Sequence, residues 1–217
     1  MTNSWKHVWF DYDDTLVDTV GSRIPAIIEY CRDVQCIGTS EEEILKIWGI
    51  PFKDMMRELG CKQDVVIDEY LSIAANHPIK PFAESEEVLN RLSSRTELGI
   101  ITSVARSILL RDLDALGWSA SKFKEIVAQE DTEYHKPDPR VFDSALSKAK
   151  SAGVAPESIL YVGNAMSDAE AALSAGLGFL GVARTAAQRE LFRSAGVDFS
   201  NDLKELCTLV RPREIRP

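Results

Sequence analysis

The segment Phe10-Asp11-Tyr12-Asp13-Asp14-Thr15-Leu16 places three carboxylates and a threonine within five consecutive residues, directly after an apolar run. Carboxylates this close repel one another unless a cation or a proton lies between them. Asp and Thr are common in turns and helix caps, so a single such residue would carry little information. Three acids together favour a hard divalent cation, and Mg²⁺ typically binds through one or two carboxylates, waters and a substrate phosphate.

Further polar residues follow later apolar runs of the chain. Thr102 and Ser103 follow one run, Asn164 and Asp168 follow another, and Lys136 lies in a proline-rich loop. Taken singly, Lys136 is explained as a solvated charge and Thr102 as a strand-end cap. In an open parallel sheet, however, such strand ends face one crevice. Together these residues predict a site for a phosphate group and magnesium.

The elements that must position these residues are short apolar runs followed by segments of helical periodicity, a pattern typical of a parallel sheet covered on both faces. Helices are predicted at about 105–116, 139–151, 167–175 and 186–194, and Gly117, Gly153 and Gly176 are suited to cap three of them. The predicted strands are His7–Phe10, Leu98–Thr102, Glu125–Ala128, Ser158–Gly163 and Gly178–Val182.

Between the first and second strands, from about residue 20 to 80, the pattern is helical and contains no convincing strand. Ser40 and Glu43 have the spacing of a capping box at the start of one helix. The other helical segments are Ile24–Val34, Phe52–Leu59 and Asp64–Ala75. We therefore predict an α/β fold with a Rossmann-like parallel-sheet core, residues 1–17 and 83–217, and an inserted all-helical domain, residues 18–82.

Composition excludes several classes of protein. The 217 residues are 45% hydrophobic, with 25 Lys and Arg against 34 Asp and Glu, a net charge of −9. Such a charge argues against a nucleic-acid-binding surface. No apolar run approaches the length of a membrane span, and no secretion signal is visible, so we expect a cytoplasmic protein without membrane contact. The four cysteines lack metal-site spacing and are expected to be reduced and mostly buried.

Four of these motifs, in the same order, resemble those of the haloacid dehalogenase-like superfamily. Asp11 to Thr15 fits its DxDxT motif, and Thr102 resembles its second motif, a hydroxyl residue at a strand end. Lys136 before a proline resembles the third motif, and Gly163 to Asp168 resembles the fourth, commonly GDxxxD. The inserted helices are similar to the helical cap of that superfamily, so the resemblance covers nearly the whole chain.

The resemblance implies a Mg²⁺-dependent phosphatase acting on a small phosphorylated metabolite. Asp11 would be the nucleophile that becomes an aspartyl phosphate, and Asp13 the general acid and base. Lys136 would offset the charge on the transferring group. The resemblance also implies that Thr15, Thr102, Ser103 and Lys136 bind the phosphate, and that Asp11, Asp13, Asn164 and Asp168 hold the metal.

The fourth motif departs from the usual pattern, because Asn164 stands where these phosphatases usually carry the first aspartate. An amide oxygen can bind Mg²⁺ but has no charge. We therefore hypothesise that activity survives with weaker dependence on magnesium, or that Asp168 takes over the contact.

Three alternative functions remain open from the sequence. A haloacid dehalogenase is disfavoured, since halide needs no protonation and Asp13 would have no purpose. A phosphomutase similar to β-phosphoglucomutase would use the same residues. A non-catalytic phosphate-sensing protein, with Asn164 reflecting decay, belongs to another class.

Substrate choice is expected to lie in the inserted helices, since a cap excludes water and contacts the rest of the substrate. Trp48-Gly49-Ile50-Pro51-Phe52 resembles a segment in caps of the phosphoglycolate phosphatase branch. Lys53 and Arg57 are therefore candidates to contact a substrate anion. A helix junction with solvated basic residues is the alternative. Both a monomer and a homodimer are compatible with the sequence.

Overall fold

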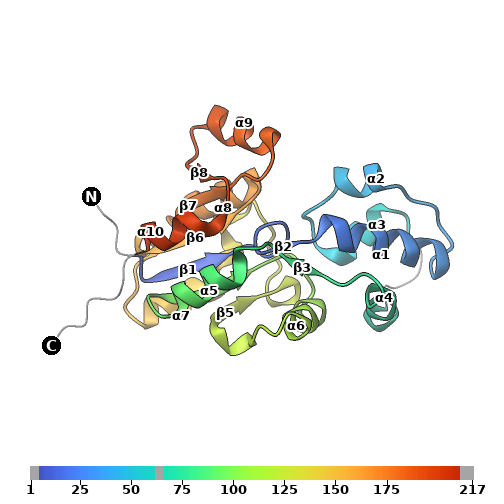
Figure 1. The fold of residues 1–217 in the computed structure, drawn as a ribbon, viewed down its shortest axis with the longest axis horizontal. Coiled ribbons are helices and arrows are strands. Elements are labelled where there is room, and N and C mark those ends of the chain that lie inside the picture. Colours follow the sequence, from blue (N-terminus) through green and yellow to red (C-terminus); the bar gives the residue numbers. More distant parts are fainter. Residues whose placement is uncertain (1–4, 62–65, 211–217) are drawn as a thin grey trace.

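A six-stranded parallel sheet lies at the centre of the computed structural model, which describes residues 5–61 and 66–210 (Figure 1). The strand order is β5-β4-β1-β6-β7-β8. The sheet therefore grows from β1 to one side through β4 and β5, and to the other side through β6, β7 and β8. The strands are β1 (His7–Phe10), β4 (Glu97–Ile101), β5 (Phe123–Val127), β6 (Ile159–Gly163), β7 (Gly178–Val182) and β8 (Phe199–Ser200). Such a reversal of strand order is where open parallel sheets bind ligands.

The sheet is covered on both faces, and for this reason the central strands are continuously apolar. In β1, Val8 and Phe10 belong to one buried cluster, whereas Trp9 belongs to the other. The first cluster includes helices α5 (Ser85–Ser93), α6 (Arg106–Ala115) and α10 (Leu206–Leu209), and the second includes α7 (Asp143–Ser151) and α8 (Met166–Ser174). Helix α9 (Ala186–Ala195) follows β7.

The described residues between β1 and α5 form four helices that lie together at one end of the molecule (Figure 1). A two-stranded antiparallel ribbon of β2 (Val17–Asp18) and β3 (Lys80–Pro81) links them to the sheet. Ser40 and Glu43 form the predicted capping box at the start of the second helix. The four helices are α1 (Val20–Asp33), α2 (Glu41–Lys46), α3 (Phe52–Glu58) and α4 (Ile67–Ala74).

Several sequence expectations about the elements are corrected. The predicted helix at 139–151 opens with a 3₁₀ turn, Pro139–Phe142, and becomes α-helical only at Asp143. The β2–β3 ribbon and β8 were not predicted, because two-residue strands leave no periodic pattern. The predicted start at Asp64 lies outside the described residues. Gly117, Gly153 and Gly176 have the positive φ values expected of helix ends.

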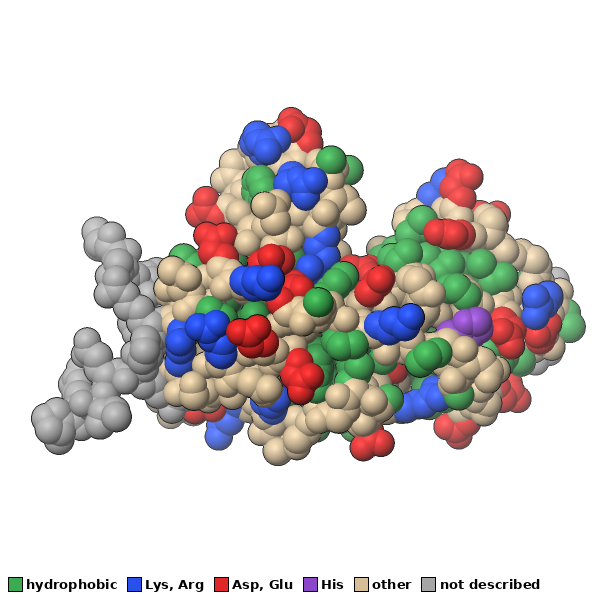
Figure 2. All heavy atoms as spheres, viewed as in Figure 1, with side chains coloured by type: hydrophobic (Ala, Val, Ile, Leu, Met, Phe, Trp, Pro, Cys, Tyr) green, Lys and Arg blue, Asp and Glu red, His purple; other side chains and the backbone are tan. Residues whose placement is uncertain are grey.

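The charged side chains on the face shown in Figure 2 are interspersed, with acidic and basic groups next to one another. All four cysteines are free, but only Cys31 is buried, so the expectation that most are buried is wrong. Within residues 5–61 and 66–210, no helix has both the length and the apolar character needed to cross a membrane.

Candidate active site

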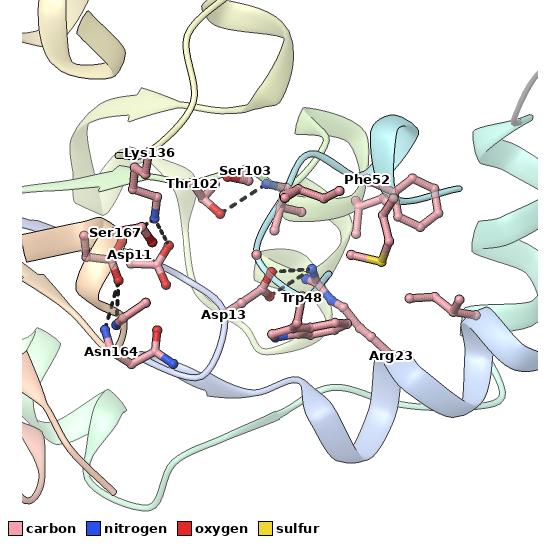
Figure 3. Close-up of a pocket in the computed structure, with 18 of the residues that line it drawn as sticks. Asp11, Asp13, Arg23, Trp48, Phe52, Thr102, Ser103, Lys136, Asn164 and Ser167 are labelled. Atoms are coloured by element: carbon pink, nitrogen blue, oxygen red, sulfur yellow. Dashed lines mark hydrogen bonds and ion pairs between the residues drawn. The ribbon is translucent and has the colours of Figure 1, made fainter. Parts of the chain in front are cut away.

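A cavity of about 250 Å³ lies at the carboxyl ends of β1, β4 and β6, where it also contacts the inserted helices (Figure 3). The ends of these parallel strands are held side by side by backbone hydrogen bonds, such as Asp11 N–H to Val162 O (2.8 Å). This arrangement brings together residues far apart in the chain. Among the residues predicted for the site, those lining the cavity are Asp11, Asp13, Thr102, Ser103, Lys136, Asn164 and Asp168.

Lys136 lies between two buried carboxylates at the inner end of the cavity. Its Nζ lies 2.7 Å from Asp11 Oδ1 and 2.6 Å from Asp168 Oδ1. It also donates to Tyr161 Oη at 3.2 Å, and that hydroxyl donates to Ile101 O. Burial raises the pKa of Asp11 to about 7, and the Lys136 ammonium opposes this rise. Lys136 therefore supports the charged form of Asp11.

Asp168 holds the loop after β6 in place. Its Oδ2 accepts hydrogen bonds from the Asn164 N–H (3.1 Å) and the Ala165 N–H (3.0 Å), which precede helix α8. A Cβ atom at position 163 would overlap the Asp168 carboxylate, so glycine is required there. Asp168 thus fixes both Lys136 and the backbone that presents Asn164.

Thr15 joins Asp11 to Asn164 beneath the cavity. Its Oγ1 lies 3.3 Å from Asp11 Oδ2 and 3.4 Å from Asn164 Oδ1, so these two acceptor oxygens converge on one hydroxyl. Both oxygens are hard metal ligands of the kind that Mg²⁺ prefers. No three His, Cys, Asp or Glu side chains of the described residues are grouped to hold a metal. The donor set fits a cation with few protein ligands, completed by main-chain, water and substrate oxygens.

Asp13 lies at the mouth of the cavity, on the side away from Lys136 and Asn164, and is paired with Arg23 from helix α1 (Figure 3). Arg23 Nη1 lies 2.9 Å from Asp13 Oδ1, and Nη2 lies 2.5 Å from Asp112 Oδ2 in helix α6. Burial raises the pKa of Asp13 to about 6, and Arg23 opposes the rise. A carboxyl group with this pKa can both give and take a proton near neutral pH.

Asp14 contributes to the structure around the cavity. Its φ of 55° is in the left-handed region. Its Oδ1 accepts hydrogen bonds from the Thr19 and Val20 N–H groups at the start of α1. Its Oδ2 accepts one from Trp48 Nε1 at 2.8 Å. Asp14 therefore fastens both α1 and the Trp48 segment to the end of β1.

Thr102 and Ser103 follow β4 and line the cavity opposite Asn164. The Thr102 Oγ1 accepts a hydrogen bond from the Val104 N–H at 3.2 Å, which shapes the turn before helix α6. Thr102, Ser103 and Ile108 of the ten-residue helix α6 therefore line the same cavity as Asp11. The two hydroxyl groups can donate hydrogen bonds to anionic oxygens.

Lys53 and Arg57 are not among the residues that line the cavity. Lys53 is exposed, and the Arg57 guanidinium is paired with Asp54 at 2.7 Å on the surface of helix α3. The structure instead brings Arg23 to the cavity, which the sequence did not single out. The predicted helix begins at Ile24, whereas α1 begins at Val20 and so includes Arg23. The one signal in the sequence is a cation near the start of a helix, where cations are disfavoured.

Known proteins resemble this chain over most of its length. A pyrophosphatase PpaX of Anoxybacillus flavithermus is 27% identical, over 88% of this chain and 90% of that protein. A phosphoglycolate phosphatase of Xylella fastidiosa is 27% identical, over 79% of this chain and 77% of that protein. The structure of CbbY from Rhodobacter sphaeroides, solved with phosphate, has the same fold, with a TM-score of 0.75, 19% identity and coverage of 93% and 96% of the two chains.

The sequence model of the haloacid dehalogenase-like hydrolases matches residues 8–182, which include the strand ends that form the cavity. The parallel sheet with helices on both faces agrees with the fold of the solved relatives. On this evidence, the chain belongs to the haloacid dehalogenase-like hydrolase family.

Proposed function

We propose that the chain is a Mg²⁺-dependent phosphatase that hydrolyses a small phosphomonoester through an aspartyl phosphate on Asp11. The observation that carries this proposal is the position of Asp11, which faces the cavity with one carboxylate oxygen 2.7 Å from the Lys136 ammonium. The named phosphatases among its relatives support the same reaction class.

Asp11 attacks phosphorus, and the bond from phosphorus to the leaving oxygen breaks as the new bond to the Asp11 carboxylate forms. Lys136 favours the ionised form of Asp11 before the attack and offsets charge on the phosphate oxygens during it. We propose that the hydroxyls of Thr102 and Ser103, which line the same cavity as Asp11, hold those oxygens. Thr15 orients the second oxygen of Asp11.

Asp13 gives its proton to the leaving oxygen and afterwards takes a proton from the water that hydrolyses the aspartyl phosphate. Its pKa of about 6 suits both steps, since neither form is strongly disfavoured near neutral pH. Arg23 holds the Asp13 carboxylate at the cavity mouth. Asp13 also argues for an alcohol rather than a halide as the leaving group, because a leaving alkoxide needs a proton and a halide does not.

For the cation, we propose that Asp11, the main-chain carbonyl of Asp13 and the amide oxygen of Asn164 are the protein ligands, with Asp168 supporting the loop. Bound Mg²⁺ would offset negative charge on the phosphate. Because Asn164 is uncharged, we expect a higher Mg²⁺ concentration to be needed than with a carboxylate there.

We also propose that residues 1–17 and 83–217 form the hydrolase core and residues 18–82 a helical cap. The short β2–β3 ribbon is the connection between them and supports this division.

The test is phosphate release from p-nitrophenyl phosphate, measured across a Mg²⁺ titration for the native protein and for Asp11→Asn. We expect Mg²⁺-stimulated release from the native protein and a rate lower by more than about 10³ in Asp11→Asn, since removal of a nucleophile has effects of this order. Equal rates would exclude Asp11 as the nucleophile. No metal-stimulated release from any phosphate ester would favour the phosphate sensor.

A further inference from the structure

The outer part of the cavity differs in character from its inner end. Asp11, Lys136 and Asn164 lie at the inner end, whereas Trp48, Arg23 and Phe52 lie on the side of the inserted helices (Figure 3). The inserted segment contributes six apolar or aromatic side chains to the lining: Ile27, Trp48, Ile50, Phe52, Met55 and Tyr70. The atoms of a substrate that extend beyond its phosphate group would therefore meet an apolar wall.

This wall is held in a defined position. The rings of Phe52 and Tyr70 are in contact, with centroids 4.6 Å apart, and the Phe52 N–H donates to Gln129 Oε1 on the core at 3.1 Å. The Trp48 indole N–H is already bonded to Asp14. With its one polar group occupied, Trp48 offers the cavity an apolar ring.

A second anionic group on the substrate would find no available cation here. Among the described residues that line the cavity, Arg23 and Lys136 carry the only positive charges. Lys136 is held between Asp11 and Asp168, and both terminal nitrogens of Arg23 are paired with Asp13 and Asp112. Arg23 and its two carboxylates have a net charge of −1 when ionised, which repels a further anion.

The volume of the cavity limits the size of the substrate group that extends beyond the phosphate. The cavity holds about 250 Å³, less than the lower end of the range of about 300–1,000 Å³ usual for sites of drug-sized ligands. The phosphate occupies part of this space, and the rest has room for a group of about one ring.

We propose that the substrate is a phosphomonoester of a small, uncharged and largely apolar alcohol, rather than one with a second anionic group. This assignment rests on the phosphatase activity proposed above and adds the class of the leaving group. A carboxylate or second phosphate on the leaving group would lose its hydration against Ile50 and Phe52 without gaining a cationic partner. An aryl or alkyl group buries apolar area there instead.

The experiment compares two phosphonates that cannot be hydrolysed, benzylphosphonate and phosphonoacetate, which differ only in a phenyl ring or a carboxylate on the same methylene phosphonate. Binding of each to the native protein is measured by calorimetry with Mg²⁺ present. We expect benzylphosphonate to bind tighter by about tenfold to a hundredfold, as burial of a ring of this size implies. Equal affinities, tighter phosphonoacetate, or binding of neither would overturn the assignment.

A pair of variants locates the effect in the wall. Ile50→Lys places a cation on a half-buried position that lines the cavity, and Lys53→Met removes a cation from an exposed position nearby. Ile50→Lys should reverse or abolish the preference, whereas Lys53→Met should leave it unchanged. A change in preference with Lys53→Met of the same size would contradict the role of the wall. Circular dichroism is the check on whether Ile50→Lys folds like the native protein.

The phosphatase activity and the substrate class can fail separately. If benzylphosphonate is preferred but no ester releases phosphate, the proposed activity is wrong and the binding preference stands. If esters are hydrolysed with 2-phosphoglycolate turned over at higher kcat/KM than phenyl phosphate, the activity stands and the substrate class is wrong.

Discussion

Arg23 Nη1 lies 2.9 Å from Asp13 Oδ1 and donates to Asp13 Oδ2 at 3.2 Å, so a residue of the first inserted helix holds the carboxylate that follows β1. The same guanidinium reaches Asp112 in helix α6. Its position therefore depends on the inserted helices and the sheet core together. This relationship makes Arg23 a positioning residue for Asp13.

Replacement of Arg23 by Gln should lower kcat by about tenfold to a hundredfold, because small displacements of a reacting group have effects of this size. KM should change much less, since the residues proposed to bind the phosphate lie at the inner end of the cavity. Steady-state kinetics with p-nitrophenyl phosphate measure both. Arg111→Gln is the matched control, since Arg111 joins α6 to α4 through Leu71 O without contacting Asp13. An equal fall in kcat for both variants would assign the effect to docking of the helices.

Replacement of Lys136 by Met should abolish activity and destabilise the fold. It leaves the buried carboxylates of Asp11 and Asp168 without their cation, and breaking a buried pair in this way costs about 3–5 kcal/mol. Urea unfolding at neutral pH measures the change in the free energy of unfolding. Lys46→Met is the control, because Lys46 Nζ is 2.9 Å from Glu42 Oε1 and both side chains are exposed, at 66% and 81%. That change should cost less than about 1 kcal/mol. Similar losses in the two variants would contradict the account.

Gly163→Ala should destabilise the protein by about 1–3 kcal/mol and reduce activity, because the added methyl group overlaps the Asp168 carboxylate. Displacement of Asp168 would release the Asn164 and Ala165 N–H groups and move Lys136. Thermal unfolding and the Mg²⁺ dependence of the rate are the measurements. Gly38→Ala adds the same methyl group where nothing lies within 4 Å, and it should have little effect. Full activity of Gly163→Ala would show that Asp168 is not needed in this position.

Glu84→Gln should lower stability at neutral pH, with a difference that shrinks in acid. Glu84 is buried, which favours its neutral form, but the hydrogen bond from Arg184 at 2.8 Å and backbone N–H groups outweigh burial and hold its pKa below the ordinary value of 4.5. The charged pair thus stabilises the fold fully above pH 4.5, and this contribution is lost as the pH falls through the lowered pKa. At pH 7 the loss should be about 1.5–3 kcal/mol.

Urea unfolding of both proteins at pH 7, 5 and 3.5 measures this dependence. The gap between the native protein and Glu84→Gln should be widest at pH 7 and narrowest at pH 3.5. A gap independent of pH would mean that Glu84 acts through packing and not through its charge.

Much of the inner site could be predicted from the sequence. Asp11, Thr102 and Asn164 each follow an apolar strand, and the carboxyl ends of parallel strands necessarily meet at one edge. Local patterns also predicted the Ser40–Glu43 capping box and the glycines that end three helices. These features depend on residues close together in the chain, or on the one geometry that parallel strands share.

The cavity mouth was decided by the tertiary structure. Arg23 rather than Lys53 or Arg57 lines the cavity and contacts Asp13, because the packing of α1 and α3 against the core determines which side of each helix turns inward. The contact of Arg23 with Asp112 joins residues 89 positions apart, which no local pattern encodes. Sequence alone thus determined the family, five of the six strands of the sheet and the residues at the inner end of the cavity. Only the tertiary structure decided the apolar wall of the cavity and the pairing of Asp13 with Arg23, because both arise where the inserted helices pack against the sheet core.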